Sequence, residues 1–95
     1  MSARAELSVV VLISGSGSNL QALIDATANG LPARIAAVIS NRADAQGLEI
    51  ARQAGIETAV VEHTAYPDRE QYDAALADCI DRYRPGLVVL AGFMR

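Results

Sequence analysis

The chain has 95 residues, of which 52% are hydrophobic and 20% charged, and its formal net charge is −3 at pH 7. This length allows one small domain, and the composition is typical of a globular chain rather than a disordered one. Eight arginines and no lysine face 11 acidic residues, so we expect no nucleic-acid or anionic-membrane partner. A single cysteine, Cys79, and a single histidine, His63, exclude an internal disulfide and a Cys/His zinc cluster.

The amino-terminal region lacks the pattern of a secretion signal. Its apolar run, Val9–Ile13, has five residues, whereas a signal peptide needs roughly 7 to 15. No stretch approaches the roughly 20 apolar residues that cross a bilayer. We therefore expect a cytoplasmic protein in which residues 1–7 form a flexible tail.

Short apolar runs alternate with helical patterns along the chain. Buried strands are predicted over the following ranges: Ser8–Ile13, Arg34–Ser40, Thr58–Val61 and Leu87–Ala91. Three helices are predicted between the strands. The first follows the loop Ser14–Asn19 and ends at Asn29 and Gly30, and the second covers Ala43–Ala54 and ends before Gly55. The third begins at a capping box formed by Asp68 and Gln71 and continues through Tyr83. Strands in this order connect through right-handed crossovers. The sequence thus predicts an α/β fold, a Rossmann-like parallel sheet with helices on both faces in the order βαβαβαβ, as one domain over residues 1–95.

Ligands of such sheets bind beyond the carboxyl ends of the strands. Three segments belong there: Ser14–Asn19, Ser40–Arg42 and Gly92–Arg95. In the first of them, free N–H groups and the positive end of a helix dipole favour an anion. A tight turn in which Ser18 caps the helix explains the same residues without a ligand. The pattern leaves both interpretations open.

The spacing of the first loop narrows the choice of phosphate ligand. Counting from Gly15 and Gly17 puts Leu20 at the third glycine of a dinucleotide fingerprint, and no acidic residue follows the second strand. NAD is therefore not expected, although Arg42 leaves an NADP-binding interpretation open. A Walker A loop is excluded because it needs a lysine. A monophosphate group therefore remains as the expected phosphate ligand of this loop.

Four segments in this order and spacing carry a resemblance to a known family: VVLISGSGSNLQALIDA (Val10–Ala26), SNRADAQGLEIARQAGI (Ser40–Ile56), YPDREQYDAAL (Tyr66–Leu76) and VVLAGFMR (Val88–Arg95). They resemble the phosphoribosylglycinamide formyltransferases, folate-dependent enzymes of purine synthesis, from about Val9 to the last residue. The resemblance implies transfer of a formyl group from 10-formyltetrahydrofolate, as co-substrate, to the amine of glycinamide ribonucleotide. It implies neither a metal nor NAD.

The resemblance also assigns residues to the two ligands. It implies that the phosphate of glycinamide ribonucleotide is bound by Gly17, Ser18 and Asn19. It associates the formylfolate site with the segments that contain Arg69, Met94 and Arg95. The family's catalytic asparagine, histidine and aspartate lie downstream of the matched segments, so we expect no catalytic residue in residues 1–95. The expected partner is then a carboxyl-terminal half, without which this chain alone is inactive.

Purely structural roles explain several of these residues equally well. His63 is expected to be a solvated loop residue and Cys79 a core residue on an apolar helical stripe. Arg69 fits equally well as a surface residue in the first turn of a helix. The alternatives for the whole chain are a non-catalytic phosphate- or nucleotide-binding fragment and an NADP-linked reductase fragment. An apolar fourth strand without further cover also predicts self-association.

Overall fold

The computed structural model describes residues 7–15, 18–91 and 93 of the chain. Within these residues the elements are, in order, β1 (Leu7–Ile13), α1 (Ser18–Ala28), β2 (Ala33–Ser40), α2 (Gln46–Gln53), β3 (Glu57–Val60), the 3₁₀ helix η1 (His63–Ala65), α3 (Arg69–Asp81) and β4 (Leu87–Leu90). The predicted order βαβαβαβ is confirmed. The prediction of a flexible tail over residues 1–7 is wrong at Leu7, which pairs with Ala33 in the sheet. The rest of the tail, residues 1–6, lies outside the described residues.

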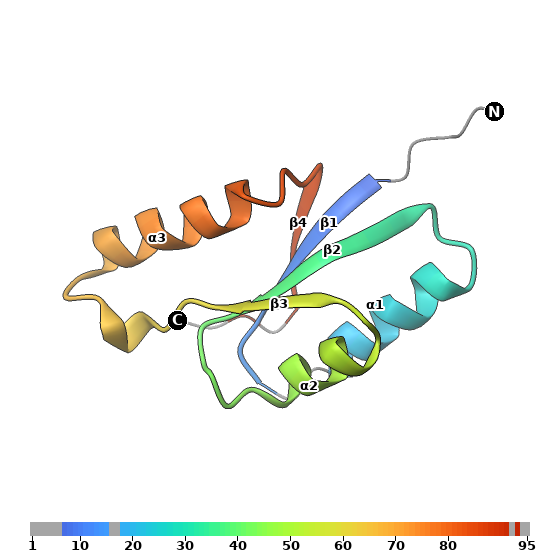
Figure 1. Ribbon diagram of the computed structural model, residues 1–95, viewed down its shortest axis with the longest axis horizontal. Helices are drawn as coiled ribbons and strands as arrows, with labels where there is room; N and C mark the ends of the chain where they lie inside the picture. Colours follow the sequence, from blue (N-terminus) through green and yellow to red (C-terminus); the bar gives the residue numbers. More distant parts are fainter. Residues whose placement is uncertain (1–6, 16–17, 92, 94–95) are drawn as a thin grey trace.

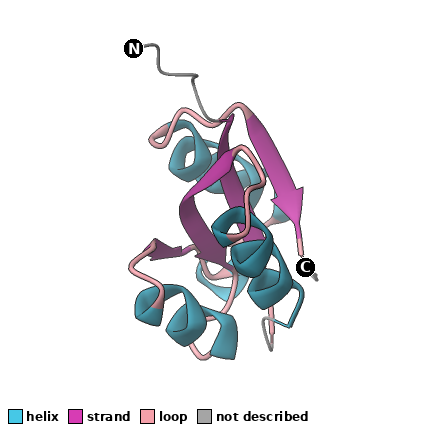
Figure 2. Cartoon of the chain, turned by 90° about the vertical axis from the view of Figure 1, so that its right-hand side faces the viewer, coloured by secondary structure: helices cyan, strands magenta, loops and turns pink. Residues whose placement is uncertain are grey.

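The strands form one parallel sheet in the order β3-β2-β1-β4. Helices α1 and α2 lie on one face of this sheet and α3 on the other, as Figure 1 and Figure 2 show from two directions. The chain builds outward from β1 through β2 to β3 and then returns to place β4 on the other side of β1. The carboxyl ends of β1 and β4 therefore flank the point at which the strand order reverses. The predicted fold class is confirmed.

A bulge in β2 determines on which face of the sheet its side chains lie. Val9 pairs with Ile35 but Val10 pairs with Ala37, so Ala36 is an extra residue on β2. Ile35 packs in the cluster under α1 and α2, whereas Ala37 packs in the cluster under α3. In a regular strand these two residues would face the same side.

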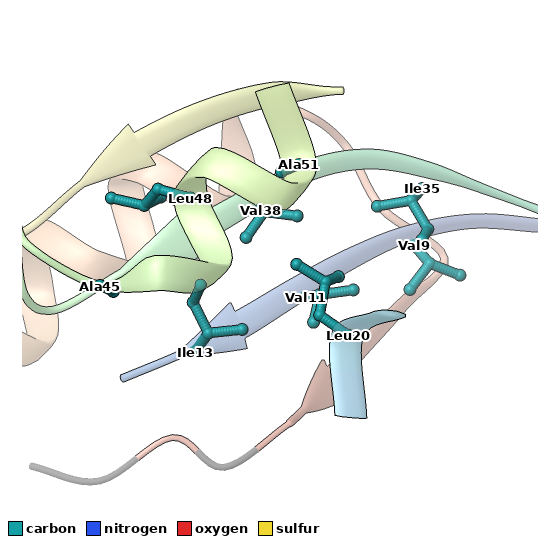
Figure 3. Packing of buried hydrophobic residues seen from close by; sticks show 9 residues of the cluster. All are labelled: Val9, Val11, Ile13, Leu20, Ile35, Val38, Ala45, Leu48 and Ala51. Atoms are coloured by element: carbon teal, nitrogen blue, oxygen red, sulfur yellow. The ribbon is translucent and has the colours of Figure 1, made fainter. Parts of the chain in front are cut away.

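The sheet divides the hydrophobic core into two clusters. The cluster under α1 and α2, drawn in Figure 3, contains Val9, Val11, Ile13, Leu20, Ile35, Val38, Ala45, Leu48 and Ala51. The cluster under α3 contains Val10, Leu12, Ala37, Ile39, Val61, Tyr72, Leu76 and Cys79. Both faces of β1 and β2 are thus covered, which explains their continuous apolar runs. The predicted core position of Cys79 is confirmed.

The helix ends follow their predicted signals more closely than the helix starts do. Gly55 ends α2 with φ of 76°, and the N–H groups of Gly55 and Ile56 donate to the carbonyls of Arg52 and Ala51 at 3.0 and 2.9 Å. This is a Schellman motif, which favours glycine at the left-handed position. The start of α1 lies at Ser18, within the predicted loop Ser14–Asn19, and the start of α2 lies at Gln46 rather than at the predicted Ala43. Residues 41–45 form a hydrogen-bonded loop instead.

The two edge strands are less buried than the sequence predicts. The prediction that β4 is buried is wrong, because Leu87, Val88 and Leu90 are 47%, 39% and 65% exposed. β4 pairs with β1 only, and of its four residues Val89 packs against a buried cluster. β3, at the opposite edge, is also only partly buried. An apolar run indicates a strand that needs cover, and nothing in the described part of the chain covers the outer side of β4.

Candidate functional site

The candidate site lies at the carboxyl edge of the sheet, where parallel strands deliver their following loops to one side. We call residues 14–17, after β1, the first loop and residues 41–45, after β2, the second loop. The segment 61–68 follows β3 and leads through η1 into α3. Residues 91–95 follow β4. The described residues of the segments in which the sequence predicted binding chemistry therefore lie at this edge or border it.

The first loop leads directly into α1. Ser14 is half-buried and Gly15 is exposed. Ser18 is the first residue of α1, so the expectation that Ser18 precedes the helix as its cap is off by one position. Asn19 is exposed in the first turn. Gly17, the remaining residue of the predicted phosphate site, lies outside the described residues.

The first turn of α1 contains no acidic side chain, whereas α2 and α3 carry Glu49 and Glu70 in theirs. A carboxylate in a first turn balances the positive end of the helix dipole. The amino end of α1 lacks this balance from its own first turn. The start of α1 is thus the helix start at which no carboxylate of the first turn would repel an external anion.

The second loop is organised by Ser40, the last residue of β2, which is fully buried. Its hydroxyl donates to the carbonyl of Arg42 at 2.8 Å and accepts from the N–H of the same residue at 3.0 Å. The N–H of Ala45 also donates to the Arg42 carbonyl, at 3.4 Å. The loop meets the first loop where the N–H of Gly47 donates to the carbonyl of Gly15 at 3.1 Å. Sequence analysis did not assign this role to Ser40. The signal that could have indicated it is a serine at the end of a buried apolar strand.

Arg42, the basis of the NADP alternative, is paired with a carboxylate of its own loop. Its guanidinium donates two hydrogen bonds of 3.1 Å to Asp44. This hydrogen bonding, with the opposite charges, lowers the pKa of Asp44 and raises that of Arg42. Both side chains are largely exposed, so solvent screens the pair. A phosphate at Arg42 would have to compete with Asp44.

Arg69 borders a pocket of about 340 Å³ at the start of α3, together with His63, Tyr66, Asp68 and Tyr72. Two of its walls are fixed by edge-to-face ring contacts, because the rings of His63 and Tyr66 lie 6.4 and 5.9 Å from that of Tyr72. Asp68 caps α3, as predicted, by accepting from the N–H of Gln71 at 2.8 Å. Arg69 is exposed and takes part in neither ion pair found among the described residues.

Phe93, in the segment after β4, lies on the same face of the sheet as α3. Phe93 packs against the cluster under α3, to which Tyr72 belongs. This brings residue 93 to the face on which Arg69 begins α3. Met94 and Arg95, the other predicted folate-site residues, lie outside the described residues.

Three hollows follow one another along this edge. The first, of about 230 Å³, lies between Gly15 of the first loop and the second loop. The next, of about 520 Å³, lies between the second loop and η1, and the third is the pocket beside Arg69. Neighbouring hollows share wall residues, Arg42 in the first two and His63 in the last two. The edge thus offers an extended binding surface rather than a single cavity.

The remaining candidate residues are not part of a reactive cluster. His63 is exposed, as expected. Burial raises the pKa of the Cys79 thiol above 9.0, so the thiol is protonated at neutral pH. Among the described residues no group of three His, Cys, Asp or Glu side chains could hold a metal ion. None of the helices in this part of the chain is long and apolar enough to cross a membrane.

Comparison with known proteins gives consistent matches. Residues 7–95 match the family described as Formyl transferase. The phosphoribosylglycinamide formyltransferase of Escherichia coli (strain K12) is 57% identical over 90 residues, 94% of this chain and 42% of that protein. That of Schizosaccharomyces pombe is 52% identical over 99 residues, 92% of this chain and 47% of that protein.

A solved structure agrees with these sequence matches. The phosphoribosylglycinamide formyltransferase from Coxiella burnetii, in complex with CHES, has a TM-score of 0.92 and 54% identity over 95% of this chain and 43% of that one. The chain thus spans less than half the length of each of these relatives. The resemblance noted in the sequence is confirmed. Since the family match extends over residues 7–95, the chain belongs to the formyl transferase family.

Proposed function

We propose that this chain is the amino-terminal portion of a phosphoribosylglycinamide formyltransferase. The whole protein would transfer a formyl group from 10-formyltetrahydrofolate to the amine of glycinamide ribonucleotide, in the cytoplasm, as a step of purine synthesis. The observation that carries the proposal is the family match over residues 7–95. It is supported by the common location of the predicted segments at the carboxyl edge of one parallel sheet.

The phosphate of glycinamide ribonucleotide would bind at Gly17, Ser18 and Asn19. Backbone N–H groups at a helix start can hold a phosphate dianion without a lysine, and this chain has none. The absence of an acidic side chain in the first turn of α1 supports this assignment, because such a carboxylate would repel the ligand.

The formylfolate would bind along Arg69, Met94 and Arg95. A folate combines flat rings with carboxylates, and the pocket beside Arg69 combines aromatic walls with an exposed guanidinium. These groups fit such a ligand by stacking and by a charge-assisted bond to a carboxylate. The packing of Phe93 on the α3 side of the sheet supports a shared site for both segments.

The chain's own share of the reaction would be binding and orientation. Formyl transfer forms a bond between the amine nitrogen of glycinamide ribonucleotide and the formyl carbon, and it breaks the bond between that carbon and the folate nitrogen. The amine loses a proton and the folate nitrogen gains one as tetrahydrofolate leaves. The reaction therefore requires groups that transfer these protons and groups that stabilise negative charge on the formyl oxygen. We propose that the remainder of the protein, absent from this chain, supplies both. Holding two substrates at adjacent places on a rigid edge lowers the entropic cost of their reaction.

Paired titrations test the binding part of the proposal. The chain is titrated with glycinamide ribonucleotide and, as a matched control, with the ribonucleoside that lacks the phosphate, and amide shifts are followed by NMR. We expect shifts at the start of α1 with the first ligand only. Equal shifts with both ligands, or none with either, would contradict the phosphate assignment.

Rate measurements test the catalytic part. We expect no formyl transfer by the 95-residue chain alone and turnover after it is mixed with the carboxyl-terminal portion of the Escherichia coli relative. Turnover by the chain alone would refute the assignment of the proton-transfer groups to the remainder. Phosphate binding without turnover on mixing would favour the alternative of a non-catalytic binding fragment.

A further inference from the structure

We propose that Ser40 is a positioning residue for the phosphate site, because it holds the second loop in the conformation in which α2 binds the first loop. The inference rests on the proposed function, since it takes the first loop and the start of α1 to be the phosphate site. It concerns a residue that would not touch the phosphate and acts through two hydrogen-bonded backbone segments.

Ser40 is held rigidly at its own position. It lies opposite Ile13 in the pairing of β1 and β2, and its carbonyl accepts from the N–H of Val61 at 2.9 Å. Its fully buried hydroxyl bonds both backbone groups of Arg42, at 2.8 and 3.0 Å. Side chain–backbone bonds of this kind compete with regular helix bonds. They explain why the predicted helix over Ala43–Ala54 starts three residues later.

The start of α2 depends on the first loop for a hydrogen-bond acceptor. The N–H groups of a first helical turn lack partners within the helix and usually receive a side-chain oxygen from the capping residue. The capping residue here is Ala45, which offers none. The N–H of Gly47 donates instead to the carbonyl of Gly15, 3.1 Å away. The first loop therefore caps α2, and α2 in turn restrains the first loop.

This restraint acts on the part of the first loop that leads into the phosphate site. Among the described residues, apart from the chain neighbours of Gly15, no atom lies within 4 Å of the position that a Cβ would occupy there. Packing of described side chains therefore does not hold this residue. The N–H of Asn41 adds a second tie to the end of β1, donating to the carbonyl of Ile13 at 3.4 Å. The bond from Gly47 thus restrains the carbonyl of Gly15, the last described residue of the first loop.

A loop that is already ordered binds its ligand more tightly than one that the ligand must order. Removing the Ser40 hydroxyl should therefore weaken phosphate binding although the site's own residues are unchanged. The effect should extend from Ser40 through the second loop to the bond between Gly47 and Gly15.

Two variants and one control test this connection. Ser40→Ala removes the hydroxyl. Ala45→Ser supplies a side-chain cap that competes with Gly15 for the first N–H groups of α2, so it loosens the first loop without weakening the helix. The control, Thr27→Val, removes a hydroxyl–carbonyl bond of 2.8 Å, from Thr27 to Ile24 near the end of α1. Each folded chain is titrated with inorganic phosphate by NMR, and amide exchange is measured at Gly47.

We expect Ser40→Ala and Ala45→Ser to weaken phosphate binding at least fivefold and the control to stay within twofold of wild type. Amide exchange at Gly47 should rise at least tenfold in Ser40→Ala. Wild-type affinity in Ala45→Ser, which retains a stable helix, would overturn the inference even if Ser40→Ala failed to fold. Unchanged exchange at Gly47 in Ser40→Ala would overturn it independently of any ligand. Absence of phosphate shifts in the wild type would instead contradict the proposed phosphate site, and with it the role of Ser40.

Discussion

The phenol of Tyr83 donates a hydrogen bond of 3.2 Å to the carboxylate of Glu57, which links the turn after α3 to the first residue of β3. Burial, followed by the nearby negative charge of Glu57, raises the pKa of Tyr83 above its ordinary value of 10.0. The folded protein thus retains this proton more strongly than the unfolded chain does. Ionisation of this tyrosine is coupled to folding.

The first prediction concerns alkaline pH. Because the folded pKa of Tyr83 is raised, its contribution to the free energy of unfolding is present below about pH 10 and is lost as pH rises through the folded pKa. Burial of Cys79 acts in the same direction from about pH 9. We expect Tyr83→Phe in a Cys79→Ala background to flatten the fall in stability above pH 9, as measured by urea unfolding. An equally steep fall in this double variant would show that other groups cause it.

The second prediction separates two glycines of the first loop. Gly15 has open space for a Cβ, and its φ lies outside the left-handed region, so Gly15→Ala should fold and bind glycinamide ribonucleotide as the wild type does. Gly17→Val should abolish that binding, because a Cβ obstructs close approach of a phosphate to the backbone. Asn19→Ala should weaken it modestly by removing one side-chain partner. Calorimetry on the three variants decides, and wild-type affinity in Gly17→Val would remove this residue from the site.

The third prediction concerns the folate ligand. Arg69→Ala should weaken binding of 5-formyltetrahydrofolate, a stable analogue, about tenfold, which corresponds to loss of one charge-assisted bond. Arg34→Ala is the matched control. Arg34 is also exposed, but it lies near the start of β2, at the amino ends of the strands and thus far from the candidate site. Tryptophan is absent from the chain, so calorimetry is the suitable measurement. Equal losses in the two variants would indicate a general charge effect rather than a site at Arg69.

The fourth prediction concerns the free edge of β4. Leu90 is 65% exposed on a strand that pairs on one side only, and such an edge can pair with a second chain. We expect the chain to self-associate with rising concentration in sedimentation velocity and Leu90→Lys to shift it toward monomer. Val60→Lys, on the opposite edge strand β3, should leave association unchanged. A monomeric wild type at all concentrations would contradict the prediction.

Local signals predicted most of the elements. The apolar runs of β1 and β2, the capping aspartate Asp68 and the terminal glycine Gly55 act within a few residues of chain, and all four appear in the structure as predicted. The burial of β4 was mispredicted because an apolar run indicates that a strand favours burial, but it does not show whether other elements are present to bury it. The sequence pattern fits a strand covered on both faces, and the described residues do not supply that cover for β4.

The site was predictable in its location but not in its internal bonding. Fold rules assigned the segments that begin at Ser14 and Ser40 to the carboxyl edge, and Ser14 follows the end of β1 while Ser40 is the last residue of β2. Arg69 was assigned to a ligand by resemblance alone, and that assignment stays a prediction. The bond between Gly47 and Gly15 was not visible, because it joins backbone groups 32 positions apart. Backbone donors and acceptors are the same in every non-proline residue. Only the three-dimensional arrangement reveals such a pair.

The extra residue Ala36 interrupts the pairing of β2 with β1 and divides β2 into two separately paired halves. Ahead of it, Ile35 keeps its register with Val9; beyond it, the strand pairs regularly until Ser40 meets Ile13. Misalignment near the start of β2 can be absorbed at the bulge, where an unpaired residue already interrupts the ladder. The half that ends at the binding edge is thereby insulated from length changes in the turn between α1 and β2. Variation in that turn should accumulate among related chains without displacing Ser40.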